Sequence, residues 1–134
     1  MSLRLILLSA PVTIDERYGV FSGAASTEPS FALVCLGAVA RRAGADVSIV
    51  EASAGGMSPE RAASLAVSSR PELVGISSTT SGIVASARLA ELIKKSNPET
   101  MVIIGGCHAS AIPAETLAEF KAFVSGFCSA QPFD

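Results

Sequence analysis

The sequence predicts an α/β fold in which helices cover both faces of an open parallel sheet, and three observations point to it. Short apolar segments alternate along the chain with segments of helical character. The apolar segments are unbroken, as is typical of strands buried on both faces of a parallel sheet. Apolar residues make up 49% of the 134 residues and charged residues only 16%, so the chain can bury a sizeable core.

Charge and cysteine content argue against several classes of function. The formal net charge is −2 and the ten Lys and Arg residues are scattered, whereas nucleic-acid binding normally requires a basic cluster. Cys35, Cys107 and Cys128 are odd in number and widely spaced, so they match neither a disulfide framework nor a zinc site. The longest apolar run, residues 31–40, is about half of a membrane span. We therefore expect a cytoplasmic protein with reduced thiols that binds neither nucleic acid nor membrane.

The first predicted strand, residues 3–8, is a run of Leu and Ile with one Arg near its start. Segment 9–28 follows it without a helical period. At about 20 residues it far exceeds the usual strand-to-helix loop of about 2–6 residues, and loops of that length are usually functional.

The first predicted helix, residues 29–42, starts at Pro29, which suits the first helical position, with Thr27 or Glu28 as its cap. Gly44 suits the left-handed residue that stops a helix. The helix is apolar almost all round, and such a helix is either buried or covered by a partner. Two interpretations stay open: a surface for a missing domain or subunit, and a central helix with small exposed alanines.

The next two elements are a strand over residues 46–51 and a helix over residues 58–69. Ser58 can cap the free N–H groups of this helix, and Pro59 costs nothing at its first position.

The third predicted strand, residues 72–77, leads into a helix over residues 81–96 that ends at Asn97-Pro98. The pattern predicts that one side of that helix is buried, with Leu89, Leu92 and Ile93. A charged stripe on its exposed side contains Arg88, Glu91 and Lys95. The β-branched residues of 100–104 predict a fourth strand, and a short helix over 113–119 and a weak fifth strand over 122–125 follow.

This alternation predicts a Rossmann-like fold with the flavodoxin-like strand order 2-1-3-4-5 and right-handed crossovers. Ligands of such folds bind at the carboxyl ends of the strands where the order reverses. Here those ends lead into the three segments 9–28, 77–81 and 105–110. We therefore expect these segments to converge on one binding site.

The known fingerprints of nucleotide and phosphate sites are absent from this edge. Neither Gly-x-Gly-x-x-Gly nor Gly-x-x-x-x-Gly-Lys-Ser/Thr occurs, and the acidic residues of a receiver domain are missing. His108 could face Ser77 in a small hydrolase, but Ser77 is not in a Gly-x-Ser-x-Gly elbow and no acid is obvious. Small residues at Ser77, Thr79, Gly105 and Gly106 instead favour a slot for a flat heteroaromatic ligand. The alternative that Gly105-Gly106 is only a tight turn before a helix stays open.

Two motifs carry a resemblance to a known family, Val74-Gly75-Ile76-Ser77-Ser78-Thr79-Thr80 and Val102-Ile103-Ile104-Gly105-Gly106-x-His108-Ala109. With the segments around them, in order over nearly the whole chain, the sequence resembles the N-terminal cobalamin-binding domain of radical S-adenosylmethionine enzymes. This group includes anaerobic magnesium-protoporphyrin cyclase and many cobalamin-dependent methyltransferases.

The resemblance implies one cobalamin-binding domain over residues 1–134, as a fragment of a longer protein. It implies base-off binding, with the dimethylbenzimidazole tail in the slot. The family's Asp-x-His-x-x-Gly pattern is replaced in the first loop by Asp15-Glu16-Arg17-Tyr18-Gly19, so no His of this loop can be the lower cobalt ligand. The implied contact residues are Pro11, Tyr18, Gly19, Ser77, Ser78, Thr79, Thr80, Gly105, Gly106, Cys107 and His108.

Catalysis is expected to lie elsewhere in the parent protein. The Cys-x-x-x-Cys-x-x-Cys motif that holds an iron–sulfur cluster is absent. A [4Fe–4S] cluster and S-adenosylmethionine would then belong to a downstream domain in cis, which would also choose the substrate. The alternatives are a docking or homodimerisation domain that uses helix residues 31–39 and has lost cobalamin, and a small independent α/β hydrolase-type enzyme.

Overall fold

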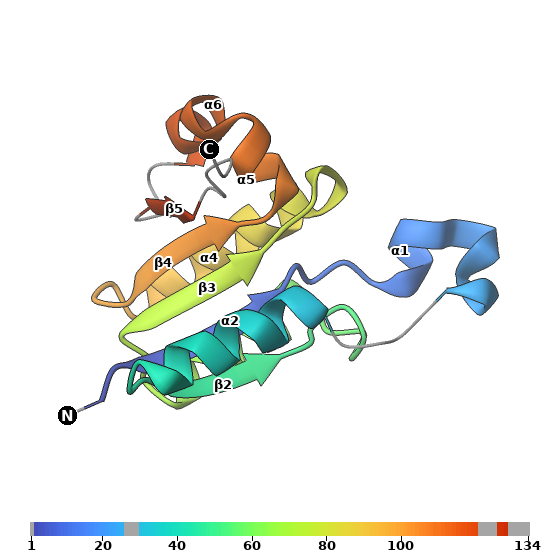
Figure 1. The fold of residues 1–134 in the computed structure, drawn as a ribbon. Helices are drawn as coiled ribbons and strands as arrows, with labels where there is room; N and C mark the ends of the chain where they lie inside the picture. Colours follow the sequence, from blue (N-terminus) through green and yellow to red (C-terminus); the bar gives the residue numbers. More distant parts are fainter. Residues whose placement is uncertain (1, 26–29, 121–125, 129–134) are drawn as a thin grey trace, which may run out of the picture.

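The computed structural model describes residues 2–25, 30–120 and 126–128. These residues form an open α/β sheet with helices on both faces (Figure 1). No helix within these three ranges is long and apolar enough to cross a membrane.

Four strands form a parallel sheet in the predicted order β2-β1-β3-β4. They are β1 (Arg4–Ser9), β2 (Asp46–Val50), β3 (Leu73–Ser77) and β4 (Met101–Gly105). The short β5 (Gly126–Cys128) pairs in parallel with the outer edge of β4. The fifth strand that the sequence predicts at 122–125 lies outside the described residues. The register places Ser9, Ser77 and Gly105 side by side at the carboxyl edge.

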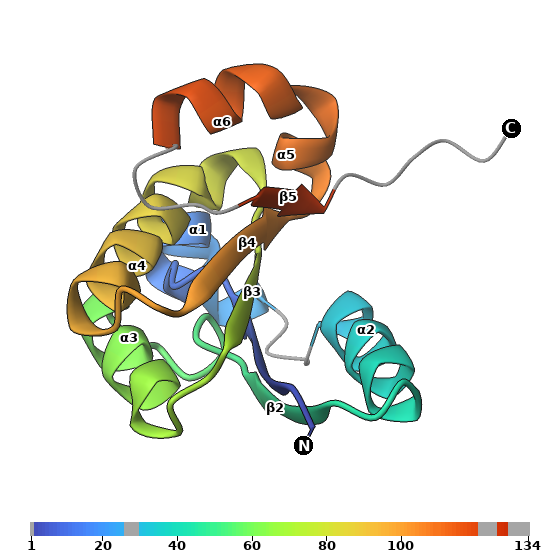
Figure 2. The same ribbon diagram turned by 90° about the vertical axis from the view of Figure 1, so that its left-hand side faces the viewer.

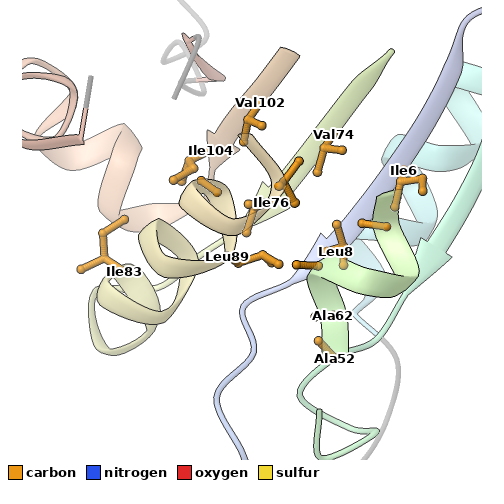
Figure 3. Packing of buried hydrophobic residues seen from close by; sticks show 14 of the residues in the cluster. Ile6, Leu8, Ala52, Ala62, Val74, Ile76, Ile83, Leu89, Val102 and Ile104 are labelled. Carbon is orange, nitrogen blue, oxygen red and sulfur yellow. The ribbon is translucent and has the colours of Figure 1, made fainter. Parts of the chain in front are cut away.

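One face of the sheet is fully packed. Side chains from alternate strand positions are buried there against the helices α3 (Pro59–Ser68) and α4 (Ile83–Ser96). Figure 3 shows these strand side chains, which are Ile6, Leu8, Val74, Ile76, Val102 and Ile104. Leu89 and Ile93 of α4 are also fully buried in this cluster, as the sequence predicts. Most of the apolar burial that stabilises the fold lies on this face.

The charged stripe of α4 faces solvent, as predicted. Glu91 Oε1 lies 2.9 Å from Lys95 Nζ, and its Oε2 lies 2.9 Å from Arg88 Nη1. The hydrogen bonds from Lys95 and then Arg88 lower the pKa of the Glu91 carboxyl.

The opposite face is covered mainly at one side, by α2 (Phe31–Arg42) over β1 and β2 (Figure 2). Leu33, which is 1% exposed, packs with Leu5 and Leu7 in a small separate cluster. Within α2 only Leu33 and Gly37 are buried. The interpretation of α2 as a central buried helix is therefore wrong, because its apolar outer face is exposed at Phe31, Val34, Leu36 and Val39.

Several predicted helix boundaries need correction. Helix α2 begins at Phe31 with Ser30 as its cap, since the Ser30 hydroxyl accepts a hydrogen bond from the Leu33 N–H. The predicted caps, Thr27 and Glu28, lie outside the described residues. Gly44, with φ +95°, does follow the helix as predicted. Helix α3 begins after Ser58 as predicted, and helix α4 is preceded by the 3-10 turn η2 (Thr80–Gly82).

Two segments that the sequence predicts as loops contain helices. Segment 9–28 carries α1 (Ile14–Tyr18) and the 3-10 helix η1 (Gly19–Ala24). Segment 105–110 carries α5 (Cys107–Ala111), which precedes the predicted helix, α6 (Pro113–Phe120). Both α1 and α5 have only five residues, and a single turn shows too little periodicity to be recognised from sequence.

The unequal burial of two leucines on α2 predicts unequal costs of truncation. We expect Leu33→Ala to lower the free energy of unfolding by about 2–4 kcal/mol, because it leaves a cavity in the small cluster. Leu36→Ala on the same helix, where Leu36 is 51% exposed, should cost less than about 1 kcal/mol. Urea unfolding followed by circular dichroism measures both, and equal losses would show that α2 is not anchored through Leu33.

Candidate functional site

A groove of about 810 Å³ lies between α2 and the part of the sheet that α2 leaves uncovered. The face formed by β1, β3 and β4 is its floor, α2 is one wall, and residues of α5 line it at the carboxyl edge. Its lining residues are Leu5, Leu7, Ala32, Leu33, Leu36, Val39, Ala40, Ala43, Leu73, Gly75, Ile76, Ser77, Ile103, Gly105, Gly106, Cys107 and Ser110.

The floor of the groove follows from the strand register. Leu7, Gly75 and Ile103 are direct neighbours across three strands and form one level of the floor. Gly75 has no side chain, and Leu7 occupies the space beside it: a Cβ atom at Gly75 would lie 2.8 Å from Leu7 Cδ2. The glycine therefore lets Leu7 pack low over the sheet, which keeps the groove deep.

Among the described residues that line the groove, the polar side chains all lie at its rim, at the carboxyl edge. Ser77 and Gly105 end their strands side by side, and Cys107 and Ser110 stand on α5 just beyond. Among the described residues, no side-chain hydrogen bond is made by the Ser77 hydroxyl, which lines the groove. This hydroxyl can therefore donate to or accept from a ligand atom.

A tight crossing of two loops shapes the rim. The Ser78 N–H donates to the Gly105 carbonyl over 2.9 Å, which brings the loop after β3 against the loop after β4. Gly106 then turns the chain with φ +108°, and a Cβ atom there would overlap the Ser78 carbonyl oxygen. Ser78 itself is buried, and its hydroxyl donates to the Thr79 carbonyl, so it supports the rim from below.

The remaining hydroxyl residues lie outside the lining of the groove. Thr79 is exposed, and its hydroxyl shares a hydrogen bond of 3.0 Å with Ser81 Oγ. His108 Nδ1 lies 3.2 Å from Thr80 Oγ1, so the histidine pairs with Thr80. As cofactor contacts, Thr79, Thr80 and His108 remain predictions. The partner of His108 gives no support to a Ser77–His108 hydrolytic pair.

The predicted residues of the first loop are also outside the groove. Pro11 is buried just after β1, whereas Tyr18 and Gly19 are exposed on an arm formed by α1 and η1. Figure 1 shows that this arm extends away from the sheet beyond the carboxyl ends of the strands.

A reciprocal cap starts the arm. Glu16 N–H donates to Thr13 Oγ1, and Thr13 N–H donates to Glu16 Oε2 over 2.7 Å. Hydrogen bonds to Thr13 lower the pKa of the Glu16 carboxyl, and the bond to the Thr13 backbone has a larger effect than the bond to the Thr13 hydroxyl. The Thr-x-x-Glu spacing was the sequence signal for this helix, and the sequence prediction missed it.

Several lining residues were not predicted from the sequence, among them Leu7, Leu36, Ile103 and Ser110. Leu7 and Ile103 could have been found from the alternation of strand side chains together with the parallel register. Gly75 gave a further signal, because glycine inside a strand often marks a close approach. Over the three described ranges, no group of three or more His, Cys, Asp or Glu side chains is placed to hold a metal ion.

The left-handed turn at Gly106 predicts a strong requirement for glycine. We expect Gly106→Ala to lower the free energy of unfolding by about 1–3 kcal/mol, because alanine is strained at this φ and meets the Ser78 backbone. Gly23→Ala is the control, since no atom lies within 4 Å of a Cβ atom there. Denaturant unfolding of the two variants checks this, and a Gly106→Ala protein as stable as the control would contradict the described turn.

Comparison with known proteins adds one match to this geometry. A family model described as the B12 binding domain matches residues 19–128, which is most of the chain. The matched range runs from the arm to β5 and contains both loops of the rim and most of the groove lining. No match was found among curated proteins. The extent of the family match, over a parallel α/β sheet with a groove at its carboxyl edge, shows that this chain belongs to the B12-binding domain family.

Proposed function

We propose that this chain is the cobalamin-binding module of a cytoplasmic radical S-adenosylmethionine enzyme. Cobalamin binding follows from membership of the B12-binding family. The observation that carries the more specific proposal is the groove, which reaches the carboxyl edge of the sheet, has polar side chains at that edge and is apolar beneath. We propose that it receives the nucleotide tail, while the corrin ring stays outside, over the strand ends.

The residues present fit such a tail. Gly105 lines the groove at the end of β4 without a side chain, so a flat base can approach the backbone closely there. Leu7 and Ile103 offer apolar contact to the faces of the base. The Ser77 hydroxyl at the rim can hydrogen-bond a ring nitrogen or the sugar.

Base-off binding is the state consistent with this placement, since a base held in the groove is separated from the cobalt. The first loop supplies no histidine in its place. Bound cobalamin would supply a cobalt centre able to carry a methyl group. The protein's own residues would hold and orient the cofactor and exclude water from its tail.

The remaining chemistry is proposed for a downstream domain in cis, on the strength of the sequence resemblance. That domain would hold the [4Fe–4S] cluster and S-adenosylmethionine, and the parent protein would be a methyltransferase-type or cyclase-type enzyme. For residues 1–134 we propose a single domain of the flavodoxin-like type with the full five-stranded order 2-1-3-4-5.

A docking or homodimerisation domain without cobalamin is the second candidate. The exposed apolar side chains of α2 favour it, since Phe31 is 81% and Val39 68% exposed. A chain that self-associates but retains no hydroxocobalamin after desalting would favour this candidate over the first. No observation favours the third alternative, an independent hydrolase-type enzyme.

The proposed slot makes Gly105 sensitive to bulk. We expect Gly105→Val to reduce cobalamin retention at least tenfold, because an isopropyl group would occupy the floor of the groove beside Ser77. The far-ultraviolet circular dichroism should be unchanged, since valine suits a strand. The visible absorbance retained after desalting measures binding, and Gly23→Val is the control outside the groove. A folded Gly105→Val chain that binds normally would place the slot elsewhere.

Two free cysteines provide a test that requires no change to the groove. Cys107 lines the groove, whereas Cys35 is exposed on α2 and does not line it. In a Cys128→Ser background, we expect saturating hydroxocobalamin to slow maleimide modification of Cys107 at least fivefold, because the ligand covers the thiol. The rate at Cys35 should change by less than twofold. Peptide mass spectrometry over time follows both thiols, and equal rates with and without ligand would argue against the groove as the binding site.

A further inference from the structure

We infer that the groove selects corrinoids by the base of their nucleotide tail and favours a benzimidazole over a purine. This inference rests on the proposed placement of the tail in the groove. It adds the chemical class of ligand that the site prefers.

The separation of polar from apolar lining carries the inference. The side chains that can form hydrogen bonds, those of Ser77, Cys107 and Ser110, all stand at the carboxyl edge. Below them every lining side chain that the structure describes is hydrocarbon. On the floor these are Leu5, Leu7, Leu73 and Ile103, and on the wall Ala32, Leu33, Leu36, Val39, Ala40 and Ala43.

The backbone beneath the rim offers little to a polar ligand. The strands β1, β3 and β4 pair with their neighbours along the floor, from Leu5–Leu73 to Leu7–Gly75–Ile103. Their N–H and C=O groups are directed along the sheet into these ladders. A ligand atom lying over the floor therefore meets carbon and hydrogen.

The two kinds of base differ in what they would bring into this environment. Dimethylbenzimidazole and adenine are both flat bicyclic rings of similar size. Beyond the nitrogen that binds cobalt and the nitrogen that joins the sugar, the benzimidazole carries only two methyl groups. Adenine carries two further ring nitrogens and an amino group. Those of these groups that lie beneath the rim, away from Ser77, Cys107 and Ser110, would lose water and find no partner among the described lining residues.

The two methyl groups of dimethylbenzimidazole also favour its binding over that of adenine. They add apolar surface that contact with Leu7 and Ile103 would remove from water. Shape alone would not separate the two bases, so the preference is set by hydrogen bonding and apolar burial.

Three corrinoids test the inference on the unmodified 134-residue chain: cobalamin, its adenine-tailed analogue, and cobinamide, which has no nucleotide tail. All three are used as dicyano forms in excess cyanide. Cyanide has then already displaced the base from the cobalt, so this step does not contribute to any of the three dissociation constants. Equilibrium dialysis with visible absorbance gives the dissociation constants. We expect cobalamin to bind roughly 10- to 100-fold more tightly than the adenine form. This is the loss of affinity that one or two unpaired polar groups on the adenine would cause.

Each other outcome has a definite meaning. Equal binding of cobalamin and the adenine form, both tighter than cobinamide, overturns the inference but leaves the tail in the groove. Equal binding of all three, or of none, overturns the proposed function and the inference together.

A matched pair of variants tests whether the groove itself makes the selection. Ile103→Asn places an amide on the floor and should reduce the preference for cobalamin over the adenine form at least threefold. Met101→Asn stands on the same strand and face but does not line the groove, and should leave the preference unchanged. If Ile103→Asn does not fold, Leu36→Gln on the half-exposed wall takes its place. An unchanged preference in the groove variant overturns the inference.

Discussion

The unequal coverage of the two sheet faces is the constraint on which the rest of the structure depends. Successive strand side chains point to opposite faces, so one set of residues must be buried by helices on each side. On one face α3 and α4 bury Val74, Ile76 and their neighbours completely. On the other, α2 packs over β1 and β2, and the face of β1, β3 and β4 that no described helix covers forms the floor of the groove. The packed face stabilises the sheet, and the open face is free to bind.

The meeting of two loops at the carboxyl edge shapes the rim of that groove. The hydrogen bond from Ser78 to Gly105 and the turn at Gly106 hold two loops together there. They place Ser77 and Cys107 at the rim without covering the floor. A ligand with a polar linker and an apolar end matches this order of surfaces, and the nucleotide tail of cobalamin is such a ligand.

Much of the fold was predictable from the sequence because its elements are long or strongly patterned. The strand order β2-β1-β3-β4, the cap at Ser58 and the charged stripe at Glu91 all follow from local pattern and known handedness. The short helices α1 and α5 were missed because one turn has no period to detect. The candidate site was predicted in part: Ser77, Gly105, Gly106 and Cys107 line the groove, whereas Thr79 and His108 pair with neighbours at the surface.

The class of fold and the resemblance to cobalamin-binding domains could both be recognised from the sequence alone, and the sequence also predicts the sheet edge at which a ligand would bind. These depend on periodicity and on short motifs, which adjacent residues encode together. Only the tertiary structure decided which face is open and which side chains form the floor. Leu7, Gly75 and Ile103 are far apart in the chain and become neighbours only through the parallel register. The apolar depth of the groove, and with it the inferred preference for an apolar base, arises from that register and from the position of α2.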